Sequence, residues 1–255
     1  MNTSRHVYIA TVCLEKTRWG KREPSFSVSE WLPRFTQDGF DGIELWSYHF
    51  SRVDAAEQKR LVAAAPIPIF NSYVTFTDDT AEERSKEAMA IQQLGTRAVK
   101  FNVGNDPALL SLYKRNLLQW AETLPAHCKL LCECHPGTLL ETPEAAATFH
   151  ADLDPERYGI IVHVGNTTAA ELDTWMQTFG PRVWHLHVQF RRPDSDPSDP
   201  VKRIELDKLF AIVREHTFQG TATMEFTRGI GKDENIETIY QNACSDMAYI
   251  RSQLT

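Results

Sequence analysis

Short runs rich in β-branched and aromatic residues alternate with longer helix-patterned segments along the chain, and this alternation limits the possible folds more than any other feature. It occurs eight times. The expected strands are 6–14, 42–45, 67–74, 98–103, 129–134, 159–164, 182–188 and 221–226. The expected helices are 25–38, 54–64, 77–94 including its cap, one from about 107, one from 142, 168–179, 204–216 and 235–254.

Strands that alternate with helices of this length form parallel β-α-β units with right-handed crossovers. Eight such units in 255 residues match the size and count of a closed (β/α)8 TIM barrel. The alternative is a doubly wound open sheet, but the sequence has neither G-x-G-x-x-G nor G-x-x-x-x-G-K-[ST], the turns that bind nucleotides in such sheets. We therefore expect a single α/β domain, residues 1–255, with the TIM barrel fold.

Charge and composition argue against several classes of partner and location. The net charge is −7, whereas phosphate backbones are bound by clustered Lys and Arg, so we expect no nucleic-acid partner. No apolar run could span a bilayer and the N-terminal segment lacks a signal-peptide pattern, so we expect no membrane partner and a cytoplasmic location. Five cysteines, an odd number, do not suggest a disulfide framework.

The fifth expected strand ends in a run, residues 130–137, that reads Leu-Leu-Cys-Glu-Cys-His-Pro-Gly. Strand alternation places Glu133 and His135 on one face and Cys132 and Cys134 on the other, where the cysteines suit a helix-facing core. A buried, unpaired carboxylate is costly. Glu133 therefore needs a cation, a hydrogen-bonding partner or a catalytic role.

Polar side chains recur at the ends of the next three strands. Glu133, His163, His187 and Glu225 would lie side by side on the C-terminal rim of a barrel, where barrel enzymes carry their chemistry. A single buried histidine is more often a core residue, but two carboxylates and two imidazoles at successive strand ends favour a divalent-metal site. Their oxygen and nitrogen atoms suit Mn, Co, Zn or Mg to different degrees.

Several segments resemble the xylose-isomerase-like barrel superfamily, the group of sugar-phosphate isomerases and epimerases that is related to endonuclease IV. The segments that carry the resemblance are DGFDGIEL at 38–45, LCECHPG at 131–137, IVHVGN at 161–166, VWHLHV at 183–188 and MEF at 224–226. They run along nearly the whole chain. None of them is diagnostic by itself.

The resemblance implies metal ligands at Glu133, His163, His187 and Glu225. The family usually has Asp at the second of these positions and a His three residues later, whereas this chain has His163 and Asn166. With two carboxylates instead of three, the site would favour metals that accept nitrogen over Mg²⁺. The same departure keeps a second possibility open, namely a non-catalytic barrel with a degenerate metal site that acts as a binding protein or partner subunit.

With a metal bound, the simplest chemistry is proton transfer next to a carbonyl, through an enediolate that the ion stabilises. The resemblance assigns the acid and base roles to Glu133 and Glu225. We therefore expect a sugar or sugar-phosphate isomerase or epimerase. The alternative enzyme is a metal-dependent dehydratase or lyase acting on a keto-sugar or keto-acid, because the same enediolate can expel a β-leaving group.

Other residues are candidates for binding the substrate, which we expect to be a sugar, sugar phosphate or sugar acid. Lys100 ends the fourth strand, Trp46 could wall the pocket, and His135 could hydrogen-bond a substrate oxygen or a structural group. Arg191 and Arg228 follow the seventh and eighth strands, where barrels often hold a phosphate, although either could be an ordinary surface charge. The polar loop 191–200 is a candidate lid or binding loop. Barrels of this group commonly pair, so a homodimer is possible.

Overall fold

Eight parallel strands close into a barrel in the computed structural model, which describes residues 5–15, 21–191, 196–230 and 235–254. Neighbours in sequence pair in order, and β1 closes on β8 through the pairs Val7–Ala222, Tyr8–Thr223 and Ile9–Met224. The strands are β1 (Val7–Ala10), β2 (Ile43–Trp46), β3 (Ile69–Asn71), β4 (Ala98–Phe101), β5 (Lys129–Glu133), β6 (Tyr158–Val164), β7 (Val183–Gln189) and β8 (Thr221–Phe226). The expected TIM barrel is confirmed.

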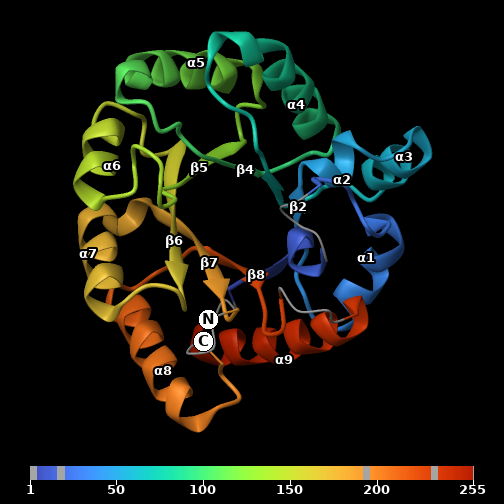
Figure 1. The fold of residues 1–255 in the computed structure, drawn as a ribbon, viewed down its shortest axis with the longest axis vertical. Helices are drawn as coiled ribbons and strands as arrows, with labels where there is room; N and C mark the ends of the chain where they lie inside the picture. Colours follow the sequence, from blue (N-terminus) through green and yellow to red (C-terminus); the bar gives the residue numbers. More distant parts are fainter. Residues whose placement is uncertain (1–4, 16–20, 192–195, 231–234, 255) are drawn as a thin grey trace.

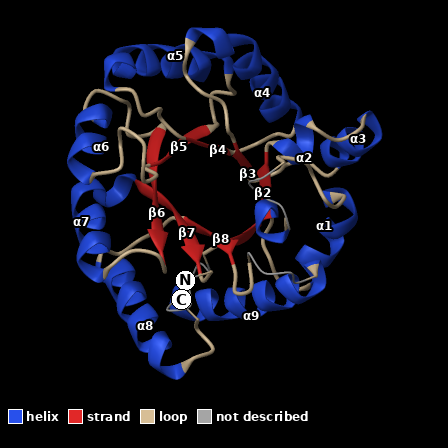
Figure 2. Ribbon diagram, in the orientation of Figure 1, coloured by secondary structure: helices blue, strands red, loops and turns tan. Residues whose placement is uncertain are grey.

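Helices form a ring outside the strands (Figures 1 and 2). They are α1 (Val28–Gln37), α2 (Tyr48–Ser51), α3 (Ala55–Ala63), α4 (Ala81–Gln93), α5 (Leu110–Thr123), α6 (Pro143–His150), α7 (Ala169–Phe179), α8 (Pro200–Glu215) and α9 (Ile236–Leu254). Among the described residues, no helix combines the length and apolar content needed to cross a lipid bilayer.

Side-chain caps set several of the helix starts. Thr168 and Glu171 form a reciprocal capping box at the start of α7, which satisfies backbone donors that the helix cannot pair. The start of α8 corrects the expected range 204–216. The helix begins at Pro200, because Asp199 accepts a hydrogen bond from the backbone nitrogen of Val201 (3.0 Å) and proline suits the first turn.

The first strand is also shorter than the expected range 6–14. It ends at Ala10, and the chain continues as a 3-10 turn, Thr11–Leu14. The hydroxyl of Thr11 accepts a hydrogen bond from the backbone nitrogen of Trp46 (2.9 Å), in the neighbouring strand β2. The Thr11 hydroxyl thus replaces a backbone carbonyl as the acceptor for Trp46, and the backbone pairing between β1 and β2 ends here.

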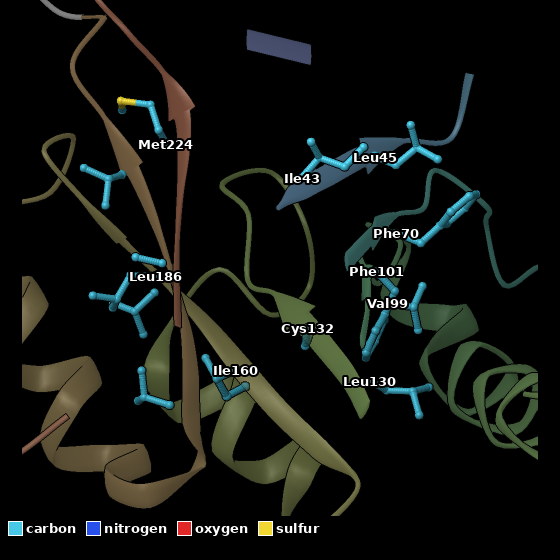
Figure 3. Packing of buried hydrophobic residues seen from close by; sticks show 14 of the residues in the cluster. Ile43, Leu45, Phe70, Val99, Phe101, Leu130, Cys132, Ile160, Leu186 and Met224 are labelled. Carbon is cyan, nitrogen blue, oxygen red and sulfur yellow. The ribbon is translucent and has the colours of Figure 1, made fainter. Parts of the chain in front are cut away.

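The hydrophobic core lies mainly between the strands and the helices, not inside the barrel. Alternate strand residues face outward into this core (Figure 3), and they include Ile43, Leu45, Phe70, Val99, Phe101, Leu130, Cys132, Ile160, Leu186 and Met224. A small separate cluster of Tyr8, Ile69, Leu131 and Ile161 fills the barrel interior near the strand starts. Among the inward positions beyond this cluster, Ala10 and Trp46 are apolar, whereas Glu44, His187 and Glu225 place charged side chains at the C-terminal end.

A close backbone approach shapes the end of β6. Gly165 has φ +97°, and a Cβ atom at this position would lie 2.2 Å from the carbonyl oxygen of Gln189. The pairing of β7 with β8 shifts register between Val188 and Gln189. Such an irregularity re-aims a side chain at the end of a strand, and the side chain of Gln189 reaches the candidate site.

Candidate active site

Side chains from four neighbouring strands meet at the C-terminal end of the barrel. Glu133, His163, His187 and Glu225 each offer one oxygen or nitrogen atom, and these four atoms lie within 4.8 Å of one another. His163 Nε2 is 3.0 Å from Glu133 Oε1 and 3.9 Å from Glu225 Oε2. His187 Nδ1 is 3.5 Å from Glu133 Oε1 and 3.3 Å from Glu225 Oε2. The structure thus brings together all four residues expected at the strand ends.

These spacings fit a single metal ion. A tetrahedral centre with bonds of about 2.0–2.2 Å separates neighbouring ligand atoms by about 3.4 Å, close to the four distances between the imidazole nitrogens and the carboxylate oxygens. The Nδ1 atom of His187 is buried and has no hydrogen-bond partner. A buried nitrogen without a partner is costly, and a bound ion would take the place of a proton on this atom. The donor set could therefore hold a divalent metal.

Glu133 divides its two oxygens between different partners. Oε2 lies 2.8 Å from the ammonium nitrogen of Lys100 and 3.1 Å from the amide nitrogen of Asn102, while Oε1 faces the two histidines. Burial by itself would raise the pKa of Glu133, but the charge of Lys100 and the hydrogen bond from His163 hold it well below its usual range. Glu133 is therefore ionised at neutral pH.

A third buried carboxylate, Glu44 on β2, supports His187 from behind. Its Oε2 atom is 3.1 Å from His187 Nε2, and its Oε1 atom accepts a hydrogen bond from the amide of Asn71 (2.5 Å). Burial opposes ionisation of Glu44, yet the His187 charge lowers its pKa. Although burial disfavours a charged imidazole, Glu44 and Glu225 raise the pKa of His187 well above its usual range. The hydrogen bond between His187 Nε2 and Glu44 orients the ring so that Nδ1 faces the site.

Sequence reasoning did not select Glu44, although the signal was present. It stands between Ile43 and Leu45 in the second strand, the same pattern of a carboxylate within an apolar run that singled out Glu133. His185 shares a second cluster of possible metal ligands with Glu44 and His187. Its two ring nitrogens lie 2.7 Å and 2.8 Å from the hydroxyls of Thr221 and Thr223, so in this arrangement it is a structural group.

Two amide side chains beside the site contact each other. The amide of Asn166 donates to Gln189 Oε1 (3.0 Å), and the amide of Gln189 donates to Glu225 Oε2 (2.5 Å). This chain of two amides fixes the orientation of Glu225. An amide pair therefore links the end of β6 to the carboxylate of β8.

A cavity of about 450 Å³ opens above the carboxylates. Its lining residues are Tyr73, Lys100, Asn102, Glu133, His135, Thr138, Gln189, Arg191, Glu225 and Phe226. Three of the expected substrate-binding residues, Lys100, His135 and Arg191, are among them. The guanidinium of Arg191 lies 5.0 Å from the centre of the Phe226 ring, and the ammonium of Lys100 lies 4.6 Å from that of Tyr73.

The other two expected substrate-binding residues do not line this cavity. Trp46 is 1% exposed and packs edge-on against Tyr73, with the ring centres 6.4 Å apart, so it lies behind the wall. Arg228 points to the start of α8, where it donates to the hydroxyl of Ser198 (2.8 Å) and faces Asp246 (3.3 Å).

The candidate lid, loop 191–200, is described only in part. Residues 192–195 lie outside the described residues, and Pro200 already belongs to α8. Arg191 therefore marks the point where the loop borders the cavity.

Solved structures similar to this chain share its fold at low sequence identity. The probable 3-DHS dehydratase AsbF of Bacillus anthracis is 15% identical, with a TM-score of 0.68 over 96% of this chain and 98% of that one. A xylose isomerase-like TIM barrel protein from Mycobacterium smegmatis, in complex with magnesium, is 14% identical, with a TM-score of 0.68 over 99% and 98%. The 3-keto-D-glucoside 4-epimerase YcjR of E. coli is 14% identical, with a TM-score of 0.66 over 97% and 99%.

No curated protein matches the sequence. The family model of the xylose isomerase-like TIM barrel matches residues 35–246, which is most of the chain and includes all four side chains of the candidate site. The chain therefore belongs to the xylose isomerase-like TIM barrel family.

Proposed function

We propose that this protein is a metal-dependent sugar isomerase or epimerase that transfers a proton at the carbon next to a carbonyl. The observation that carries the proposal is the pairing of Glu133 and Glu225, two buried carboxylates on either side of His187 at the base of a 450 Å³ cavity. Both carboxylates and the two histidines would hold a divalent ion, which would polarise the substrate carbonyl and stabilise the enediolate.

The protein's own groups prepare the proton transfer. Glu133 is ionised because Lys100 lies 2.8 Å from its Oε2 atom, so it can accept the proton. Glu225, oriented by the amide of Gln189, would act on the opposite face of the same carbon or on its neighbour. Burial opposes the charge of Lys100, but the nearby Glu133 carboxylate raises the pKa of Lys100 above its usual value. The Lys100 ammonium therefore remains positive, and it stabilises the substrate oxygen that becomes negative as the proton leaves the neighbouring carbon.

The cavity fits a small polar substrate. Its volume of about 450 Å³ lies within the range for small-molecule sites. Tyr73 and Phe226 offer aromatic faces for the carbon skeleton of a sugar, and Lys100 and Arg191 offer positive charge for its oxygens. A sugar, sugar phosphate or sugar acid satisfies both features.

A dehydratase acting on a keto-sugar or keto-acid is the second candidate, and His135 is the observation that favours it. Loss of water from the enediolate requires an acid for the departing hydroxyl group. His135 is exposed and lines the cavity together with Glu133 and Glu225. An epimerase that works with two carboxylates has no need of this third proton donor.

Metal analysis and deuterium exchange test the proposal. The purified protein is stripped with EDTA, incubated with Mn²⁺, Co²⁺, Zn²⁺ or Mg²⁺, and assayed in D₂O against ketoses, their phosphates and keto-acids by NMR. We expect a bound ion and deuterium at the α-carbon. Glu133→Gln and Glu225→Gln should reduce exchange at least about a hundredfold, the usual contribution of an acid–base group. Glu205→Gln, on the exposed surface of α8, is the matched control and should retain exchange.

The products separate the candidates. Deuterium incorporation with the substrate's atoms conserved indicates an isomerase or epimerase, and loss of water indicates the dehydratase. Absence of both a bound ion and exchange would leave the non-catalytic barrel and refute the proposal. Full exchange in both Gln variants would refute the assignment of the bases.

A further inference from the structure

A second and larger cavity, of about 740 Å³, opens at the opposite end of the barrel, where the strands begin. Tyr8, Ile69 and Leu131 from the barrel interior line its inner part, and Trp184 and Phe218 line its sides. Its walls therefore combine aromatic rings and branched aliphatic side chains with polar groups such as Arg97, Lys129 and Gln219. Such walls favour a flat apolar ligand through stacking and burial of apolar surface.

Several charged groups around this cavity already have partners. His216 Nε2 lies 2.7 Å from Asp173 Oδ1. The ammonium of Lys129 donates to the backbone oxygen of Glu156 and lies 4.4 Å from the centre of the Trp184 ring. These groups need no ligand for their own hydrogen bonding.

Two polar groups in the cavity have no such partners. Across the part of the chain that the structure describes, neither the guanidinium of Arg97 nor the hydroxyl of Tyr8 forms a hydrogen bond or ion pair with a protein group, although both residues line the cavity. Although Tyr8 as a residue is only 8% exposed, its hydroxyl group is open to the cavity. Arg97, at the mouth, presents a planar set of donors that fits a carboxylate.

The cavity is separate from the candidate active site. His185 lies between them, hydrogen-bonded to Thr221 on the cavity side, with its ring stacked over Tyr8 at a centroid distance of 6.4 Å. On its other side, His185 Nε2 is 3.6 Å from Glu44, the residue that orients His187. A ligand in the cavity at the N-terminal end of the barrel would thus contact different side chains from a substrate at the C-terminal strand ends.

We propose that the cavity at the N-terminal end of the barrel is a second binding site, for a small aromatic carboxylate. The ring lies among Tyr8, Trp184 and Phe218, and the carboxylate accepts hydrogen bonds from the Arg97 guanidinium and the Tyr8 hydroxyl. Arg97 and Lys129 against the single carboxylate of Glu156 give the lining a positive balance that suits an anion.

The test uses 2-naphthoate as the probe and the full-length protein. Binding is followed by isothermal titration calorimetry and by quenching of tryptophan fluorescence, since Trp184 lines the cavity. We expect saturable binding, weakened about tenfold in Arg97→Gln by loss of a charge-assisted hydrogen bond and about fivefold in Tyr8→Phe by loss of a neutral one. The neutral amide, 2-naphthamide, should bind wild-type protein as weakly as 2-naphthoate binds Arg97→Gln.

Arg191→Gln is the matched control, because it removes the same kind of charge at the other end of the barrel. It should leave 2-naphthoate binding unchanged. Circular dichroism melting checks that each variant is folded. The proposal is refuted by absence of saturable binding at millimolar probe, by equal affinity in Arg97→Gln and wild type, or by loss of binding in Arg191→Gln, which would place the probe in the catalytic cavity.

Discussion

Replacement of Lys100 by methionine tests how the buried charges at the strand ends are balanced. Met keeps the length and apolar stem of the side chain but removes the ammonium that lies 2.8 Å from Glu133 Oε2. Both side chains are almost fully buried, 3% and 5% exposed. Removal of one partner of a buried pair typically costs 3–5 kcal/mol, because the other charge stays buried without compensation. His163, 3.0 Å from the other oxygen, offsets part of this cost.

We therefore expect Lys100→Met to lower the free energy of unfolding by about 3 kcal/mol. For a domain of this size, that corresponds to a melting temperature lower by about 6–12 °C. Urea unfolding in EDTA at pH 7 measures the change without bound metal. Addition of Glu133→Gln to the same variant should recover at least half of the loss, since no uncompensated carboxylate remains.

The control is Lys208→Met, which breaks an ion pair of similar length, 2.7 Å to Glu205, on the solvent-exposed surface. Exposed pairs contribute little, so this variant should unfold like the wild type. If Lys100→Met is as stable as the wild type in EDTA, the reasoning is wrong and Lys100 does not neutralise Glu133. The same conclusion follows if the double variant is less stable than the single one.

Three further predictions follow from particular side chains. Burial raises the pKa of Glu87 on α4 to about 7 despite its hydrogen bond from Ser72, so the folded protein holds a proton that the unfolded chain releases above pH 4.5. Stability should fall as pH rises from 4.5 to 7, and Glu87→Gln should gain about 2 kcal/mol relative to wild type between pH 5 and 8 in urea unfolding. His163→Asp should bind Mg²⁺ or Mn²⁺ at least about tenfold more tightly in calorimetry, because hard cations prefer oxygen ligands; unchanged affinity would show that residue 163 is not a ligand. Gly165→Ala should lower thermal stability by at least about 1 kcal/mol, since Gln189 leaves no room for a Cβ atom, and an unchanged melting temperature would contradict the close approach.

The fold followed from local patterns because each β-α unit carries its own signals. Apolar runs recur with every unit, capping residues such as Thr168 or helix-ending glycines mark several of them, and eight units close a barrel. Two of the expected element boundaries were wrong at positions where a side chain competes with the backbone for a hydrogen bond. Thr11 ends β1 early by binding the nitrogen of Trp46, and Asp199 starts α8 four residues before the expected position.

The candidate site was predictable where one residue per strand end sufficed, as for Glu133 and Glu225. The partners of these residues were harder to predict, because they depend on contacts across the barrel. Glu44 reaches His187 from a strand 143 residues earlier in the chain. Arg228 follows β8, as a phosphate-binding residue would, yet its partner Asp246 on α9 draws it away from the cavity. Position along a strand predicts the face of a side chain, but not its partner.

The alternation of outward apolar and inward polar side chains limits how the strands can change in length during evolution. Deletion of one residue within a strand such as β5 would move Cys132 to the barrel axis and Glu133 into the layer beneath the helices, so folding and chemistry would fail together. Gains and losses of single residues should therefore accumulate in the loops, where substrate preference can diverge among relatives. Residues within the strands can be substituted, but the number of residues in each strand should stay the same.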